Sequence, residues 1–387
     1  MNTKELDNKY VAHSYGRFDV CLTEGSGSTL YDEAGKKYID FGSGIGVNAF
    51  GICDDEWKNA VTEQLDKVQH TSNLYYTEPC AKLAQLLCTK TGMKKVFFCN
   101  SGAEANEGAI KFARKYSNNK YGEERSTIIT LVDSFHGRTI TTLAATGQEV
   151  FHTDFGPFTP GFKYCPANDI EALRKMVTDD VCAIMFECIQ GEGGVNNLNE
   201  DFVAEINTLA KEKDILMVVD EVQTGNGRTG KYFSYEHFGI KPDIVSTAKG
   251  LGGGLPIGAV LFGEKTADCV TPSSHGSTFG GNPIVAAGAI SIVERIDDDF
   301  LIAVTEKGKY IKNFVKNIKG VKSISGMGLM VGIETHKNAG DIAKECLEKG
   351  LLVLTAHKNK VRLLPALNIS FGELNEGLNI LKEVIEK

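Results

Sequence analysis

Short apolar runs alternate with segments of helical periodicity through the middle of the chain. The clearest buried strand is predicted at 215–219, where an unbroken apolar run leads directly into Asp220. Further strands are predicted at 96–100, 127–133, 182–187, 243–248 and 257–263. Helices are predicted at 101–116, where Ser101 and Glu104 are spaced as a capping box, and near 201–213. This alternation predicts an α/β fold whose mostly parallel sheet is covered by helices on both faces.

The N-terminal part of the chain has a different pattern. Residues 1–20 are polar and predict an arm or a short helix. Residues 31–51 predict a hairpin, because alternating positions flank a turn at Asp32-Glu33-Ala34-Gly35. Two helices are predicted at 54–68 and 78–90.

Beyond about residue 283, helices dominate around a few strands. The strands are predicted at 329–334, 351–356 and 361–364, after a glycine turn at 326–328 and before a terminal helix. The change of pattern predicts a smaller α+β domain. We therefore predict three parts: an N-terminal segment (1–50) that joins the small domain, a large domain (51–282) and a C-terminal small domain (283–387).

Composition limits the classes of partner. The 387 residues carry a net charge of −8 without a massed basic run, which argues against nucleic acid or an anionic membrane. No apolar run approaches the roughly 18 residues of a membrane span, and the polar N-terminus lacks a signal core. The ten cysteines form no C-x-x-C pair, and several, such as Cys99 and Cys182, lie in apolar runs. We expect a cytoplasmic protein with reduced thiols and no metal site.

Two ionisable residues follow predicted strands. Asp220 ends one strand, and Lys249 follows another inside a loop with glycines at 250 and 252–254. Ligands of open α/β sheets bind just outside the carboxyl ends of the strands. A buried carboxylate requires a cationic or hydrogen-bonding partner, and a protonated pyridine nitrogen would serve. An enclosed amine has a lowered pKa and is nucleophilic, so we interpret Lys249 as a Schiff-base lysine, although most lysines lie on the surface.

Three other segments are candidates for binding. Ser101, Gly102 and Ala103 begin a helix directly after a strand, which makes either an anion site or an ordinary capped helix. Phe135 follows a strand and a turn, so it either lies over a bound ring or belongs to the core. Arg138 in the same polar loop is either solvated or binds a substrate carboxylate with its bidentate fork.

Glycines after Asp220 imitate two nucleotide-binding motifs. Gly225, Gly227 and Gly230 spell G-x-G-x-x-G, but five residues separate them from the strand and no clear helical periodicity follows. The run from Gly225 to Lys231 is most of a P-loop, but Tyr232 stands where Ser or Thr would hold magnesium. A glycine-rich loop explains both better, and an NAD-dependent dehydrogenase remains the rival from another class.

Six segments, taken together and in order, resemble one enzyme family. They are SGAEANE (101–107), SFHGRT (134–139), ECIQGEGG (187–194), DEVQTGNGRTG (220–230), AKGLGGGLPIG (248–258) and GSTFGGNP (276–283). The chain resembles the class-III pyridoxal-phosphate aminotransferases, and within them it is most similar to the acetylornithine aminotransferases. The likeness extends from residue 27 to residue 367. It implies the α/β fold type I of pyridoxal-phosphate-dependent transferases, with a mostly parallel seven-stranded sheet in the large domain and a smaller α+β domain.

The resemblance also implies how pyridoxal 5′-phosphate is bound. Lys249 would hold the cofactor covalently and later move a proton, and Asp220 would pair with the pyridinium nitrogen. Gln223 would contact the ring hydroxyl and Phe135 would stack on the ring. The phosphate would lie against the helix start, on Ser101, Gly102 and Ala103. Thr278 would reach the phosphate of the neighbouring subunit, which implies a homodimer.

For the substrates, the resemblance makes Arg138 a carboxylate clamp and Ser277 a further contact to acetylornithine. Arg362 would pair with Glu192 in one half-reaction and with the carboxylate of glutamate in the other. The reaction implied is transfer of the δ-amino group of N2-acetylornithine to 2-oxoglutarate, which serves arginine biosynthesis in reverse. Ornithine, succinylornithine or 4-aminobutyrate transamination, an aminomutase and a non-catalytic binding protein are the alternatives.

Two segments depart from the family pattern. Residues 51–57 read GICDDEW where the family usually has histidines and a proline, and Cys188 occupies the place of a common proline. Neither is expected to touch the reacting atoms. They leave the mouth of the pocket and the acyl preference open.

Overall fold

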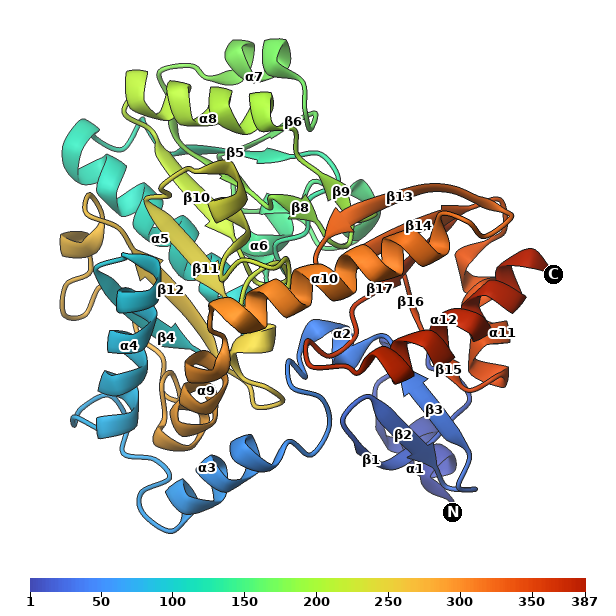
Figure 1. Ribbon diagram of the computed structural model, residues 1–387. Coiled ribbons are helices and arrows are strands. Elements are labelled where there is room, and N and C mark those ends of the chain that lie inside the picture. The colour runs from blue at the N-terminus through green and yellow to red at the C-terminus, as the bar shows by residue number, and fades with distance from the viewer.

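The computed structural model describes all residues from 1 to 387 and is built around one seven-stranded sheet. The strand order is β4-β12-β11-β10-β7-β5-β6 (Figure 1). Only β12 runs antiparallel to its neighbours, and the other pairs are parallel. The strands are β4 (Lys95–Cys99), β5 (Thr127–Leu131), β6 (Phe162–Cys165), β7 (Val181–Phe186), β10 (Leu216–Asp220), β11 (Ile244–Thr247) and β12 (Gly258–Phe262). The predicted α/β class with a mostly parallel sheet is therefore confirmed.

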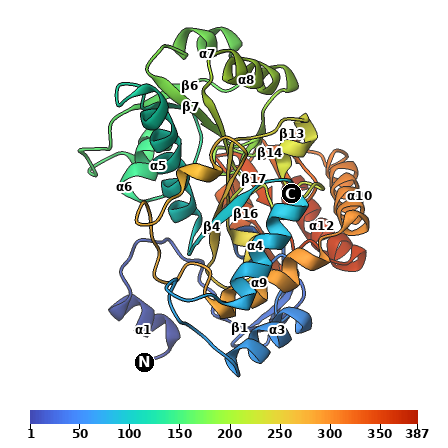
Figure 2. The ribbon, with the colours of Figure 1, turned by 90° about the vertical axis from the view of Figure 1, so that its left-hand side faces the viewer.

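Helices cover both faces of this sheet because side chains alternate along each strand. In β10, Leu216 and Val218 pack in a cluster with Phe112 of α5, whereas Met217 and Val219 pack in the larger core with α8. In Figure 2, α5 and α8 lie on different sides of β7. The helices around the sheet are α3 (Asp55–Leu65), α4 (Glu78–Thr91), α5 (Gly102–Tyr121), α6 (Ile140–Ala145), α7 (Ile170–Met176), α8 (Glu200–Glu212) and α9 (Pro283–Arg295). Short 3₁₀ helices lie at Glu149–Phe151, Ser234–Phe238, Lys249–Leu251 and Ala267–Cys269.

Two small four-stranded sheets lie beside the large one, and one of them joins the two ends of the chain. One has the order β1-β2-β3-β15, and the other has the order β13-β14-β17-β16. Because β3 pairs in parallel with β15, the N-terminal hairpin extends a sheet that the C-terminal part completes. Both termini lie on this side of the molecule (Figure 1). The elements are α1 (Thr3–Tyr10), β1 (Leu22–Ser26), β2 (Thr29–Asp32), β3 (Lys37–Asp40), α2 (Ser43–Gly46), β8 (Ile189–Gln190), β9 (Asn196–Asn197), α10 (Asp298–Val315), β13 (Val321–Met327), β14 (Met330–Thr335), α11 (Ala339–Glu348), β15 (Leu351–Leu352), β16 (Leu354–Thr355), β17 (Lys360–Leu363) and α12 (Phe371–Glu386).

Some local predictions were wrong in detail. The hairpin turns where expected, but its second strand ends at Asp40. The apolar run 351–356 is not one strand, because it divides into β15 and β16, which belong to different sheets. Strands β6 and β13 had no prediction. The domain boundaries at residues 50 and 282 stay predictions, and α9, just past the second, packs against α3 and α4.

The capping box of α5 forms only in part. The Ser101 hydroxyl accepts a hydrogen bond from the Glu104 N–H at 3.2 Å, as predicted. The Glu104 carboxylate, however, accepts from the backbone and the side chain of Asn100, at 2.8 Å each. Glu104 therefore holds Asn100, the residue before the N-cap Ser101, in place.

Other global predictions concern the thiols and the membrane. All ten cysteines are free, and Cys99 and Cys182 are buried in strands β4 and β7. No group of three or more His, Cys, Asp or Glu side chains is arranged to hold a metal ion. None of the helices combines the length and the apolar character needed to span a bilayer.

Candidate active site

A pocket of about 440 Å³ opens at the carboxyl edge of the large sheet. Parallel strands β7, β10 and β11 end there, so the residues that follow them converge. Eight of the predicted site residues line this pocket: Ser101, Gly102, Ala103, Phe135, Arg138, Asp220, Gln223 and Lys249. They come from segments up to about 150 positions apart, and the sheet topology brings them together.

Lys249 is the only lysine that lines the pocket. Its backbone adopts φ of +44°, in the left-handed region that non-glycine residues seldom occupy. The amine makes no hydrogen bond within the chain. Burial lowers the pKa of Lys249 below its ordinary value, and this effect outweighs the attraction of Glu192. A strained residue with an accessible, weakly basic amine is suited to nucleophilic chemistry.

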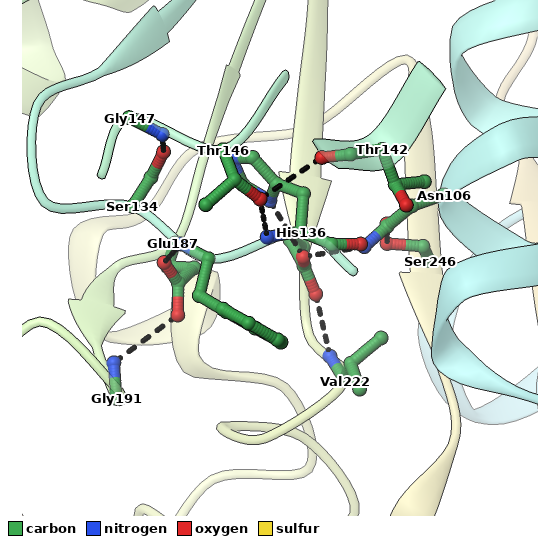
Figure 3. Close-up of polar contacts among 12 residues, drawn as sticks. Asn106, Ser134, His136, Thr142, Thr146, Gly147, Glu187, Gly191, Val222 and Ser246 are labelled. Carbon is green, nitrogen blue, oxygen red and sulfur yellow. Dashed lines mark hydrogen bonds and ion pairs between the residues drawn. The ribbon is translucent and has the colours of Figure 1, made fainter. Parts of the chain in front are cut away.

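Asp220 is a buried carboxylate that accepts three hydrogen bonds. Its Oδ1 accepts from the Val222 N–H at 2.9 Å. Its Oδ2 accepts from Asn106 Nδ2 at 2.7 Å and faces His136 Nδ1 at 2.8 Å. The three donors, Asn106, His136 and Val222, are labelled in Figure 3. Such donors stabilise the negative charge without any cation in contact, so the carboxylate is still free to pair with a cationic ligand.

The first turn of α5 presents unused donors to the pocket. The backbone N–H groups of Gly102 and Ala103 have no acceptor in the chain. A Cβ on Gly102 would lie 2.6 Å from the Val222 side chain, so only glycine fits where helix and loop meet. Free N–H groups at the positive end of a twenty-residue helix form a site for an anion such as phosphate.

Phe135 and Arg138 lie in the loop after β5. Phe135 is half-buried and lines the pocket, so it is not a core residue. Its N–H donates to Glu187 Oε2 at 3.0 Å, and its ring meets that of Phe151 edge-on. The exposed Arg138 guanidinium lies 3.9 Å from the centroid of Phe151 and 5.5 Å from that of Phe135. The aromatic pair holds this cation at the mouth of the pocket.

Arg362 and Glu192 form a bidentate ion pair next to the pocket. The two nitrogen–oxygen distances are 2.7 and 3.2 Å. Arg362 also donates to Gln223 Oε1 at 3.0 Å, which joins the pair to the pocket lining. Burial alone would raise the pKa of Glu192, but the attraction of Arg362 outweighs it and holds that pKa below its ordinary value. The Arg362 side chain is only 3% exposed, whereas that of Glu192 is 29% exposed.

Ser277 and Thr278 lie apart from the other predicted residues. Both line a second pocket, of about 420 Å³, and Thr278 is exposed. The Ser277 hydroxyl accepts from Asn100 Nδ2 at 3.1 Å, and Asn100 also lines the first pocket. Within one chain, therefore, the structure does not bring these two residues to Lys249.

Among the lining residues that were not predicted, four take part in polar contacts with Asp220 or Phe135: Asn106, His136, Glu187 and Val222. Each lies inside a segment that carries the family resemblance, and that position was their only signal. Glu187 accepts from Phe135 and from the Gly191 N–H at 3.1 Å. Burial raises the pKa of Glu187 to about 7, and nearby Asp220 raises it further while His136 opposes this.

The G-x-G-x-x-G run does not have the structure of a dinucleotide site. Gly225, Gly227 and Gly230 lie in turns after β10, and the next element is the 3₁₀ helix Ser234–Phe238. The motif therefore opens no α-helix, which a dinucleotide-binding fold requires. This argues against the dehydrogenase alternative.

The pocket fits the expected cofactor. Free N–H groups lie at a helix start for a phosphate, a stabilised carboxylate suits a protonated ring nitrogen, and the Lys249 amine has no partner in the chain. These three features line one cavity. Ser101, Gly102, Ala103, Asp220 and Lys249 are thus the residues that would hold pyridoxal 5′-phosphate.

The chain is similar to known proteins over nearly its full length. The sequence profile described as "Aminotransferase class-III" matches residues 10–385. An acetylornithine aminotransferase of Haemophilus ducreyi is 51% identical over 387 residues, covering 99% of this chain and 98% of that protein. The ornithine aminotransferase of Toxoplasma gondii ME49 has a TM-score of 0.95 at 28% identity, covering 100% of this chain and 95% of that one. The N-acetylornithine aminotransferase of Stenotrophomonas maltophilia K279a has a TM-score of 0.85 at 34% identity, covering 98% of each chain.

Proposed function

Since this chain belongs to the class-III aminotransferases, we propose that it transfers the δ-amino group of N2-acetylornithine to 2-oxoglutarate. The products are N-acetylglutamate 5-semialdehyde and glutamate, and the reverse direction serves arginine biosynthesis. One observation carries the proposal: Lys249, Asp220 and the open start of α5 line one pocket, with the Arg362–Glu192 pair beside it. The similarity to acetylornithine aminotransferases supports the choice of substrate.

Pyridoxal 5′-phosphate is the cofactor of this family, and when bound it supplies an electrophilic carbonyl and an electron-withdrawing ring. Lys249 holds it through the amine. Its free amine would also move the proton at the substrate carbon. Asp220 would accept a hydrogen bond from the protonated ring nitrogen, and Gln223 would contact the ring hydroxyl.

The remaining cofactor contacts orient the ring. Gly102 and Ala103 donate their free N–H groups to the phosphate, and Ser101 adds its hydroxyl. Phe135 stacks on the ring, and its backbone is held by Glu187. This leaves the ring little freedom, which favours proton transfer at a defined position.

The substrate contacts divide between the two half-reactions. Arg138, at the mouth of the pocket, binds the carboxylate of acetylornithine. Ser277 lines the other pocket within one chain, so its contact to the substrate would be made across the dimer. Arg362 stays paired with Glu192 in that half-reaction. When glutamate or 2-oxoglutarate binds, its carboxylate replaces Glu192 on Arg362. The greater exposure of Glu192 supports this exchange, because the carboxylate can turn into solvent while the arginine stays fixed.

We propose further that the protein is a homodimer in which Thr278 contacts the phosphate site of the partner subunit. Tyr75 and Tyr76 line the second pocket, and the Phe279 ring lies 5.2 Å from that of His70, which lines it as well. Leu74, Tyr75, Tyr76 and Phe279 are 82%, 70%, 107% and 59% exposed. A cluster of this kind marks an interaction surface. It lies beside Thr278, which does not line the Lys249 pocket of its own chain.

Mixed dimers test this arrangement. We expect a sedimentation mass of twice 42.0 kDa. Lys249→Ala and Thr278→Ala subunits, each weakly active alone, should regain activity when mixed, since one site per mixed dimer then has both Lys249 and the partner's threonine. Tyr76→Glu should favour monomers, whereas Ile302→Glu, at an equally apolar exposed position on α10, should not. A monomeric wild type, or mixtures no more active than their components, would contradict the proposal.

A titration without keto acid tests the function. N-acetylornithine, and separately ornithine, succinylornithine and 4-aminobutyrate, are added to the yellow holoenzyme while its absorbance is recorded. We expect acetylornithine to bleach the band at a concentration at least about tenfold lower than ornithine, because ornithine has a second ammonium that must be desolvated on binding. Preference for ornithine would keep the mechanism and overturn the substrate. Absence of a band after adding pyridoxal phosphate would overturn the function. The ten free thiols support the expected cytoplasmic location, which cell fractionation would test.

A further inference from the structure

The Asp220 carboxylate has one vacant accepting position. A carboxylate offers roughly four lone-pair sites, two on each oxygen. Oδ2 uses both of its sites, on Asn106 Nδ2 and His136 Nδ1. Oδ1 uses one, on the Val222 N–H. The remaining position is therefore on Oδ1, and Asp220 lines the pocket.

The orientation of the Asn106 amide is determined by its neighbours. Its Nδ2 lies 2.7 Å from Asp220 Oδ2 and 2.7 Å from the His136 carbonyl oxygen, and both of these atoms only accept. A flipped amide would face them with its own oxygen. The amide oxygen instead accepts the Ser246 hydroxyl at 2.5 Å (Figure 3). All four residues are buried, so no water competes for these contacts.

His136 is fixed in the same network. Its backbone N–H donates to the Thr146 hydroxyl at 3.0 Å, and its backbone carbonyl accepts from Asn106 Nδ2. Its Nδ1 carries a proton, because the carboxylate beside it only accepts. Its Nε2 is buried without a partner, so a second proton there would have no acceptor. The ring is therefore fixed as a donor to Asp220.

We propose that Ser246, Asn106 and His136 are positioning residues that keep the shared proton on the cofactor's ring nitrogen and not on Asp220. Donors stabilise a carboxylate only in its ionised form, so each one makes Asp220 a poorer acceptor of the proton itself. The proposal rests on the proposed pairing of Asp220 with that nitrogen. Ser246 acts through Asn106, since its hydroxyl satisfies the amide oxygen and thereby holds the N–H toward Asp220.

Three other ionisable groups line the pocket without joining the network, and one of them is Arg138 at its mouth. Glu187, at the end of β7, is bound by the backbone of Phe135 and Gly191 and makes no hydrogen bond to Asp220. Lys249 lines the same pocket after β11. Their charges act on the proton only through space, whereas Asn106 and His136 contact the carboxylate directly.

The location of the proton can be read by ¹⁵N NMR. The holoenzyme is reconstituted with pyridoxal 5′-phosphate that carries ¹⁵N in its ring, and the ring-nitrogen shift distinguishes protonated from unprotonated states. We expect a protonated nitrogen in the wild type and a larger unprotonated fraction in Asn106→Leu, Ser246→Ala and His136→Leu. The kcat should fall by about 10- to 100-fold for Asn106→Leu and less for Ser246→Ala, as expected for loss of a hydrogen bond to a charge. KM for acetylornithine should change little.

Two variants separate positioning from stability. Ser117→Ala also removes one short buried hydroxyl contact, at 2.6 Å, from a residue on the helix that carries Asn106. Ser117→Ala should lower the melting temperature about as much as Ser246→Ala does, and it should leave the ¹⁵N shift and kcat unchanged. His136→Asn keeps a hydrogen-bond donor at this position. It should therefore recover part of the protonated ring-nitrogen fraction and of the kcat that His136→Leu loses.

The outcomes distinguish the two proposals. A wild type that shows no bound-cofactor signal would overturn the proposed function. A protonated wild-type nitrogen that stays protonated in Asn106→Leu and His136→Leu, with kcat within about twofold, would overturn the positioning role alone. A shift in Ser117→Ala as large as in Ser246→Ala would overturn it as well, since that change would then reflect stability.

Discussion

Lys249→Ala is expected to lower the rate of both half-reactions by at least about 10³-fold while leaving cofactor binding in place. The variant removes the only amine that lines the pocket, and with it both the covalent bond and the group that moves the proton. The phosphate and ring contacts remain, so the protein should still bind the cofactor. Borohydride reduction followed by mass spectrometry measures the result: the wild type should gain the reduced cofactor on Lys249, and the variant should gain none.

Lys231→Ala provides the matched control. Lys231 is exposed and also lies in a glycine-rich loop, the one after β10. Its replacement should leave both the reducible bond and the rates unchanged. A reducible bond to another lysine in the Lys249→Ala protein would show that Lys249 has been assigned wrongly.

Arg362→Met is expected to separate the two half-reactions. It should lower kcat/KM for glutamate by about 10²- to 10³-fold, the size expected when a buried charged contact to the substrate is lost. The effect on acetylornithine should be smaller, because Arg138 binds that carboxylate in our proposal. Single-turnover absorbance changes with each amino donor measure both rates.

Glu192→Gln tests the exchange from the other side. The neutral glutamine competes less than Glu192 with the glutamate carboxylate for Arg362. The rate of the glutamate half-reaction should therefore rise relative to that of the acetylornithine half-reaction. Lys360→Met removes a cation from the same strand, two residues from Arg362, and should alter neither. If Glu192→Gln left both rates and their ratio unchanged, the exchange between Glu192 and substrate would be wrong.

Much of the large sheet could be predicted because its strands are continuous apolar runs that burial on both faces requires. The runs before Asp220 and Lys249 are of this kind, and β10 and β11 lie where their sequences predicted. Strands β6 and β13 are only partly buried, so their sequences lack that signal. The division of 351–356 into two strands could not be predicted for another reason. An apolar run does not show that its first half pairs with β3 and its second half with β17, in different sheets.

The polar network around Asp220 could not be predicted from the sequence. Asn106 and Ser246 are about 140 positions apart, and neither carries a local pattern that marks it as a neighbour of a carboxylate. Ser277 and Thr278 illustrate the opposite case. Their segment indicated a site residue, but within one chain they line a different pocket from Lys249.

By itself, the sequence determined the fold class, the carboxyl-edge location of the acid and the amine, and the family to which the chain belongs, because these depend on local periodicity and on ordered motifs. The tertiary structure alone decided which donors hold Asp220, how Arg362 is paired, and that the pocket lacks Thr278 within one chain. These features depend on contacts between distant segments, and the direction of a hydrogen bond is set by its neighbours in space.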